Sequence, residues 1–500
     1  MLRGNGAPSR TRSRAGSVEE IKARRRQQEW ALRKARREKQ LVSKRLLREL
    51  QEDAEEMEIR EPSVTQEEVS QLYQRIQRGS EGRLAALRSL CQLLHLKEVQ
   101  KMFVGLENSM HVLIGLFTSN LASVQLEAAL CLLHLSHADD PSISLMCLPA
   151  TPYLLTYLSG QSVKFTEQCL VILGNVAAEN EAVRNQLLLQ GVVQALENCL
   201  QSPHGAVVEA AAYSLFQLLQ AKEAGEKIVP AVLQTSLTPR LIHLLDPESE
   251  VGMPAAVEAA WCLHYIMSSG VSSDKVLISQ GLVHQAGILL IALGRAIDSG
   301  TVADGVELLI YPVVRCLGNL MASREAPLHR SQLDTHGVLQ ALSSITSKFL
   351  HSQPSLSREC LWLLNNLTAG DERFCSAFLS LGLVAALFEL IPFSDGINTL
   401  VLMLLGNIAE MGSEHCEKLQ QQKEIFSALC TVLRTSEVEA VRLTLEVLNL
   451  ILSHCEQACE EFVNQSGIPA LEAIQYHSNK EIRVRANFLM DRYFTDKKMY

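Results

Sequence analysis

Apolar and polar residues follow one another along most of this chain with the spacing of amphipathic helices. After about Glu67, apolar segments of roughly 10–15 residues are separated by short breaks containing Gly, Pro, Ser or Asp. Segments of this length indicate helices, because strands usually hold only about 5–6 residues. The low aromatic content of 5% and the abundance of Leu, Ala and Val also favour packed helices. The sequence therefore predicts an all-α chain.

One helical segment recurs at a regular interval. The same position in it falls at eight residues: His134, Asn175, Gln217, Tyr265, Asn319, Asn366, Asn407 and Asn449. These recurring residues are separated by steps of 41, 42, 48, 54, 47, 41 and 42. A period near 42 is typical of armadillo and HEAT repeats, so we predict a right-handed superhelical solenoid over residues 76–500.

A second repeated element lies out of phase with the first. A Gly introduces a further apolar helix in each of five segments, and it allows a sharp turn between helices of one repeat. These glycines are Gly191, Gly281, Gly337, Gly382 and Gly467.

The N-terminal segment differs from the repeats. Ser17 and Glu20 have the spacing of a capping box, and no Pro or Gly follows until Pro62, which predicts a long helix. The leucines of this segment do not keep a heptad register, which disfavours a coiled coil. We assign residues 1–60 to a basic arm and residues 61–75 to a linker.

Charge is divided unevenly between the arm and the repeats. Residues 1–50 hold 16 Lys and Arg against 5 Asp and Glu, whereas the rest of the chain holds 30 basic against 50 acidic residues. A basic arm on an acidic body suits an acidic protein partner, or an arm that folds back on the body. Nucleic acid is the competing, less favoured partner for the arm.

The residues that would support catalysis do not occur in a recognisable pattern. The sequence contains no phosphate-binding loop, GxSxG or HExxH, so we predict a binding protein rather than an enzyme, with no cofactor and no small-molecule substrate. The 13 Cys are scattered without a CxxC pair, and most lie in apolar helical patterns typical of reduced core thiols. Cys455 and Cys459 could share a helix face, but no second ligand pair accompanies them, and we predict no metal site.

One apolar run raises the question of a membrane. The N-terminus has no apolar region typical of a signal peptide, but Val276–Gly294 is free of charged residues for 19 positions. Gly281 and several polar residues interrupt this run. We therefore expect two buried repeat helices, with a membrane-associated chain as the alternative.

Three stretches and the arm resemble the importin-alpha (karyopherin-alpha) family. The stretches are PVVRCLGNLMAS at 312–323, RECLWLLNNLTAGD at 358–371 and GIPALEAIQYHSNKEIRVRANFLMDRYF at 467–494. The arm is similar to the importin-beta-binding segment. This resemblance implies a carrier-binding set: Arg24, Arg25, Arg26, Leu32, Arg33, Lys34, Arg36, Arg37, Lys44 and Arg45.

The recurring residues suit the recognition of a basic peptide. An Asn on the groove-lining helix can bind an extended peptide backbone, and a Trp four residues earlier can pack against a Lys or Arg stem. The resemblance implies two peptide sites, and the first three pairs, Leu130/His134, Val171/Asn175 and Tyr213/Gln217, lack the Trp. The candidate cargo-peptide residues are Asn175, Glu179, Trp261, Arg315, Asn319, Glu359, Trp362, Asn366 and Asn407.

These features together favour a nuclear import adaptor in the cytoplasm and nucleus. It would bind basic signals of cargo proteins in the groove and an importin-beta-like carrier through the arm. The alternatives are a divergent armadillo scaffold, in which an Asn such as Asn407 ties neighbouring repeats together, and a membrane-associated protein with a coiled-coil N-terminus.

Overall fold

The computed structural model describes residues 64–79, 82–269, 273–322, 326–393 and 396–494. Gln66–Tyr500 form one compact unit. Every regular element within the described ranges is a helix. The predicted all-α repeat solenoid is therefore confirmed.

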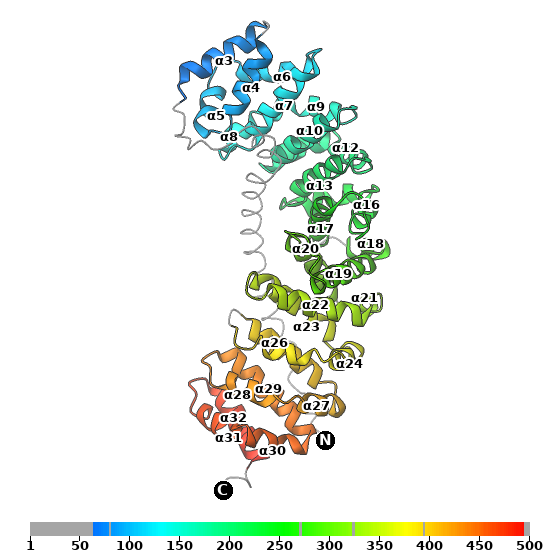
Figure 1. Ribbon diagram of the computed structural model, residues 1–500, viewed down its shortest axis with the longest axis vertical. Helices are drawn as coiled ribbons and strands as arrows, with labels where there is room; N and C mark the ends of the chain where they lie inside the picture. The colour runs from blue at the N-terminus through cyan, green and yellow to red at the C-terminus, as the bar shows by residue number, and fades with distance from the viewer. Residues whose placement is uncertain (1–63, 80–81, 270–272, 323–325, 394–395, 495–500) are drawn as a thin grey trace, which may run out of the picture. The chain divides into compact units, whose positions relative to one another are not determined.

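A row of ten long helices forms the centre of the unit, and each helix packs against the next one in the row. Figure 1 shows these helices following one another in chain order from blue to red. We call them the ladder helices: α4 (Arg83–Leu93), α7 (Ala122–Ser136), α10 (Val163–Ala177), α13 (Gly205–Leu219), α17 (Met253–Met267), α20 (Glu307–Met321), α23 (Pro354–Thr368), α26 (Ile397–Ala409), α29 (Val438–His454) and α32 (Lys480–Tyr493).

Further helices connect successive ladder helices, so that most repeats contain three helices. This is the armadillo arrangement, in which each repeat buries its apolar surface against its neighbours. The helices outside this row are α3 (Gln66–Arg78), α5 (Lys97–Val104), α6 (Ser109–Gly115), η1 (Leu116–Thr118), α8 (Pro141–Leu145), η2 (Leu148–Ala150), α9 (Thr151–Tyr157), α11 (Glu181–Leu189), α12 (Val192–Leu200), α14 (Ala224–Lys227), α15 (Val229–Leu233), α16 (Leu237–His243), α18 (Ser273–Ser279), α19 (Leu282–Asp298), α21 (Ala326–Arg330), α22 (Thr335–Phe349), α24 (Glu372–Ser380), α25 (Val384–Phe388), α27 (Ser413–Gln420), α28 (Ile425–Leu433), α30 (Glu456–Asn464) and α31 (Gly467–Ile474).

The repeat unit begins earlier than the sequence indicated. Residues 66–75 of the segment expected as a linker lie in α3, which packs on α4 and α5. Val69, Tyr73 and Ile76 are buried there, at a spacing that places them on one helix face. Most residues of α3 are polar, so the average hydrophobicity of this segment does not indicate its narrow apolar stripe.

Local sequence explains where several helices begin. Asn180 caps α11 by accepting a hydrogen bond from the backbone N–H of Val183, and Asp371 caps α24 in the same way through Phe374. Gly191 and Gly281 precede α12 and α19 with φ angles of 81° and 91°, where a side chain would be strained. Before α31 it is Ser466, not Gly467, that takes a positive φ, of 61°.

The apolar run Val276–Gly294 is divided between α18 and α19, which bend by 66° at the break around Gly281. These two helices together have the length and composition of a membrane span, but no single helix in the described part of the chain does. In the repeat unit α19 packs mainly on α22.

Candidate functional site

The candidate peptide-binding residues lie on or beside five ladder helices. Asn175 is on α10, Trp261 on α17, Arg315 and Asn319 on α20, Glu359, Trp362 and Asn366 on α23, and Asn407 on α26, while Glu179 follows the end of α10. Because successive ladder helices pack side by side, residues one repeat apart lie opposite each other. The described contacts between them show what each position does in the fold.

Asn175 joins three consecutive ladder helices. Its Nδ2 donates a hydrogen bond to Ser136 Oγ on α7 at 2.9 Å, and its Oδ1 accepts one from the Tyr213 hydroxyl on α13 at 2.7 Å. Only 3% of Asn175 is exposed. The side-chain amide of Asn175 thus already donates one hydrogen bond and accepts another within the repeats, and a peptide backbone would need both kinds of bond. Glu179 is half-buried beyond the end of α10.

Asn366 and Asn407 also reach back to the preceding ladder helix. Asn366 Nδ2 donates to the Gly318 carbonyl at 2.9 Å, and Asn407 Nδ2 donates to the Asn365 carbonyl and to Thr368 Oγ1, both at 3.1 Å. Asn407 is buried, whereas Asn319 and Asn366 are half-buried. An amide has two donor hydrogens and an acceptor oxygen, so one bond leaves Asn366 with capacity for a peptide backbone.

A cluster of aromatic and charged side chains lies across α17, α20 and α23. Trp261 stacks on Tyr311 with ring centroids 6.3 Å apart and an interplanar angle of 24°. The Arg315 guanidinium lies 4.7 Å above the Tyr311 ring, and its Nη2 is 3.2 Å from Glu359 Oε1. The structure therefore brings three candidates into one cluster.

Glu359 and Trp362 are three residues apart on α23, and both are buried. Residues at this spacing share a helix face. Glu359 thus offers a carboxylate beside the indole, although that carboxylate is already paired with Arg315. The described contacts of Asn175 and Glu179 do not reach the cluster formed by α17, α20 and α23.

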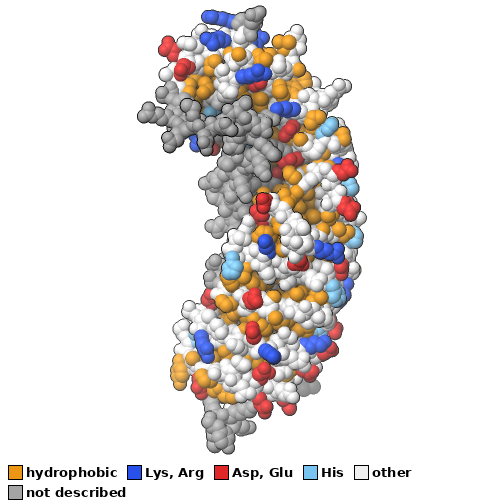
Figure 2. All heavy atoms as spheres, viewed as in Figure 1, with side chains coloured by type: hydrophobic (Ala, Val, Ile, Leu, Met, Phe, Trp, Pro, Cys, Tyr) orange, Lys and Arg blue, Asp and Glu red, His pale blue; other side chains and the backbone are white. Residues whose placement is uncertain are grey.

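Charged side chains of both signs are spread over the described repeats on the face shown in Figure 2. No group of three or more His, Cys, Asp or Glu suited to a metal ion is found among the described residues. The arm residues from Arg24 to Arg45 lie outside the described ranges, so their carrier-binding role stays a prediction.

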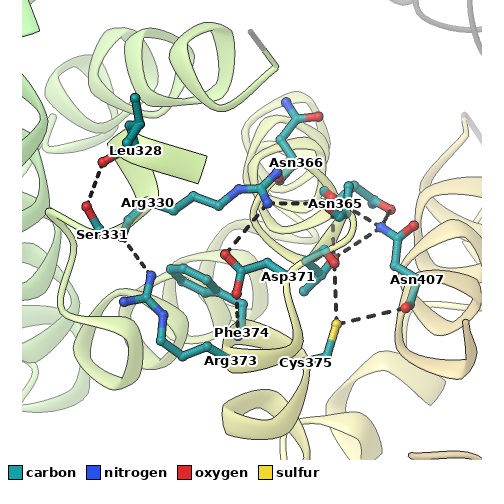
Figure 3. Close-up of polar contacts among 12 residues, drawn as sticks. Leu328, Arg330, Ser331, Asn365, Asn366, Asp371, Arg373, Phe374, Cys375 and Asn407 are labelled. Carbon is teal, nitrogen blue, oxygen red and sulfur yellow. Dashed lines mark hydrogen bonds and ion pairs between the residues drawn. The ribbon is translucent and has the colours of Figure 1, made fainter. Parts of the chain in front are cut away.

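The candidate residues named from the sequence do not include Arg330, a buried arginine that contacts α23. Arg330 of α21 donates hydrogen bonds to the carbonyls of Ala369 and Asn366, at 3.0 and 2.6 Å, and its Nη1 lies 3.7 Å from Asp371 Oδ2. Figure 3 shows its guanidinium between α23 and Asp371. Burial lowers the pKa of this guanidinium, against the opposing effect of Asp371. Arg330 satisfies carbonyls at the C-terminal end of α23, which also carries the candidate residues.

Comparison with known proteins places this arrangement in context. The TMCO6 family model matches residues 69–494. Importin subunit alpha-9 of Arabidopsis thaliana is 28% identical over 503 aligned positions, which cover 94% of each chain. Importin subunit alpha-2 of Oryza sativa subsp. japonica is 27% identical and covers 94% of this chain and 92% of its own length.

The fold is also found in a solved structure. The crystal structure of an engineered protein superposes with a TM-score of 0.63 at 20% sequence identity, and it covers 85% of this chain and 98% of its own. At this identity the likeness concerns the fold alone. The expected relationship to importin-alpha is confirmed by the sequence comparisons, which extend over nearly the whole chain.

Proposed function

The chain belongs to the TMCO6 family, and from this premise and its likeness to importin alpha subunits we propose that it is a nuclear import adaptor. The repeats bind a basic peptide of a cargo protein, and the N-terminal arm binds a carrier of the importin-beta type. The protein acts by binding, without catalysis, and works in both the cytoplasm and the nucleus.

The observation that carries this proposal is the extent of the similarity. The alignment with Importin subunit alpha-9 covers 94% of this chain, so about 30 residues at most lie outside it. The similarity therefore extends into the basic N-terminal segment as well as the repeats. A fold shared only through repeat packing would not require that segment.

Charge supports the same division of roles. Residues 1–50 hold an excess of 11 positive charges, and residues 51–500 hold an excess of 20 negative charges. Electrostatic attraction between opposite charges speeds the association of a basic peptide with the repeats. Added salt screens this attraction and weakens it. Glu179, half-buried after α10, supplies a carboxylate near Asn175, whereas the carboxylate of Glu359 on α23 is paired with Arg315.

The C-terminal half of the ladder is the better peptide site. Trp362 and Asn366 keep the Trp and Asn pair, whereas Leu130 and Val171 replace the Trp in the N-terminal half. A lost cation–π contact costs about 0.5–2 kcal/mol, so two lost contacts reduce affinity by roughly one to three decades. Asn175 is moreover held by Ser136 and Tyr213.

We expect a fluorescent basic peptide to bind at a single effective site near 315–407. Replacing Trp362 and Asn366 together by Ala should raise the Kd for the peptide at least about tenfold. The double substitution removes both the aromatic contact of Trp362 and the backbone contact of Asn366. Replacing Asn175 and Glu179 together by Ala is the matched control and should change the Kd less than about twofold. Fluorescence anisotropy titration at low and high salt measures both, with circular dichroism melts to verify folding. The opposite ranking of the two variants would contradict this placement of the site.

A scaffold without signal recognition is the second candidate. It is favoured by the ladder contacts, because Asn175, Asn366 and Asn407 all bond to neighbouring repeats. The same titration separates the two functions. A folded wild-type protein that binds no basic peptide would support the scaffold.

A further inference from the structure

Two cysteines and a histidine meet between the first two ladder helices. Cys91 lies on α4, Cys131 and His134 lie on α7, and these helices pack against each other. Cys131 Sγ is 3.8 Å from the carbonyl oxygen of Leu87, one turn before Cys91 on α4. The Cys131 thiol and the His134 ring both lie close enough to the Cys91 side chain to lower its pKa. Residues 40 positions apart are thus joined across one repeat.

The two thiols differ in exposure. Cys91 is half-buried, whereas Cys131 is fully buried. Of the 13 cysteines, only Cys91 and Cys459 are not buried. A small oxidant can therefore reach Cys91 first, and Cys131 lies directly beside it on the buried side.

The surroundings of Cys91 favour its thiolate. The hydrogen bonds from Cys131 and His134 lower the pKa of Cys91 to about 6, although burial and Glu127 act in the opposite direction. Glu127 is itself paired with Arg88, whose Nε lies 3.0 Å from Glu127 Oε1. Elsewhere burial raises the pKa of the thiols, to about 11 at Cys199 and at Cys430. Thiolate character and access together make a cysteine reactive.

We propose that Cys91 and Cys131 form an oxidation site that a hydroperoxide converts to a disulfide. The Cys91 thiolate attacks a peroxide oxygen, so that an S–O bond forms while the O–O bond breaks. The departing hydroxide or alkoxide takes a proton from water, which leaves a sulfenic acid on Cys91. The Cys131 sulfur then attacks the Cys91 sulfur; the S–S bond forms, the S–O bond breaks, and the hydroxide leaves as water with the Cys131 proton. Two electrons pass from the two sulfurs to the peroxide.

The disulfide would link α4 covalently to α7. His134 is the first of the recurring residues, so oxidation would fix the N-terminal end of the ladder. In this scheme His134 is a positioning residue, since it acts on the oxidant only through Cys91.

Peptide mapping of the full-length protein after treatment with hydrogen peroxide tests the pairing. We expect a Cys91–Cys131 disulfide as the main oxidation product, ahead of any change at Cys459. In Cys131→Ser the disulfide should be lost, and Cys91 should be labelled by a cyclic 1,3-diketone reagent specific for sulfenic acids. Oxidation of Cys459 before Cys91 would overturn the proposal, and so would wild-type protein in which Cys91 stays a thiol.

A second measurement distinguishes a reactive pair from two core thiols. Because the Cys91 pKa is about 6, its alkylation by iodoacetamide should rise only about twofold between pH 6 and pH 8. A thiol of ordinary pKa, about 8.5, would rise about 80-fold over the same range. His134→Gln should shift the Cys91 profile to higher pH while the protein stays folded. A steep, ordinary profile for Cys91 in the wild type would refute the proposal.

Discussion

Replacing Arg330 by Met is expected to lower the free energy of unfolding by about 3 kcal/mol. The variant loses two charge-assisted hydrogen bonds, to the carbonyls of Ala369 and Asn366 at the end of α23. It also leaves Asp371 without the positive charge 3.7 Å away. Methionine keeps much of the side-chain volume, so the loss reports mainly on the unsatisfied polar groups rather than on a cavity.

Arg373→Met is the matched control in the same cluster. Arg373 is exposed, and its Nη2 donates one hydrogen bond to the Arg330 carbonyl at 2.9 Å. Figure 3 shows both arginines on either side of Asp371 and Phe374. Exposed contacts of this kind contribute about 1 kcal/mol or less. Urea unfolding of the two variants measures the difference, and equal losses would show that Arg330 is not the buried anchor described here.

A second large effect is expected at Gly294, the last residue of the apolar run Val276–Gly294. A Cβ atom placed there would come within 2.6 Å of both Cα and Cβ of Ala341 on α22. Backbone cannot move aside as a flexible side chain can, so α19 and α22 would have to separate. We expect Gly294→Ala to cost about 2 kcal/mol or more, as overpacking typically does.

Gly406→Ala is the matched control for this substitution. Gly406 lies inside α26, and a Cβ there would meet only Val447 Cγ2, at 3.8 Å. Helix propensity then dominates, and this variant should be stabilised by up to about 1 kcal/mol. Hydrogen exchange over α19 and α22, together with thermal melts, checks both variants. An unchanged Gly294→Ala protein would mean that α19 does not pack closely on α22.

The sequence predicted the fold well because the repeat period is visible in single residues. The steps of 41 and 42 between recurring residues correspond to one ladder helix each, and the longer steps contain α14, α15 and the extended α19. Even the break in Val276–Gly294 follows from Gly281, whose φ of 91° suits glycine. The start of the unit was harder to predict, because α3 buries only a narrow stripe.

The site was less predictable, because its contacts join residues about one repeat apart. Asn175 and Ser136, Arg315 and Glu359, and Cys91 and Cys131 are separated by 39, 44 and 40 residues. The sequence shows which residues recur, but not which neighbour each amide or thiol will meet. Pairing polar residues one period apart would have pointed to these contacts, Arg330 with Asp371 included.

The most direct test of the import-adaptor proposal is a bridging measurement. A basic-signal peptide is immobilised, and purified importin-beta-type carrier is passed over it with and without this protein. We predict that the carrier is retained only when the full-length protein is present. The variant with Arg33, Lys34, Arg36 and Arg37 replaced by Ala should still bind the peptide but retain no carrier. Carrier retention that is independent of this protein, or unchanged by the four substitutions, would contradict the account.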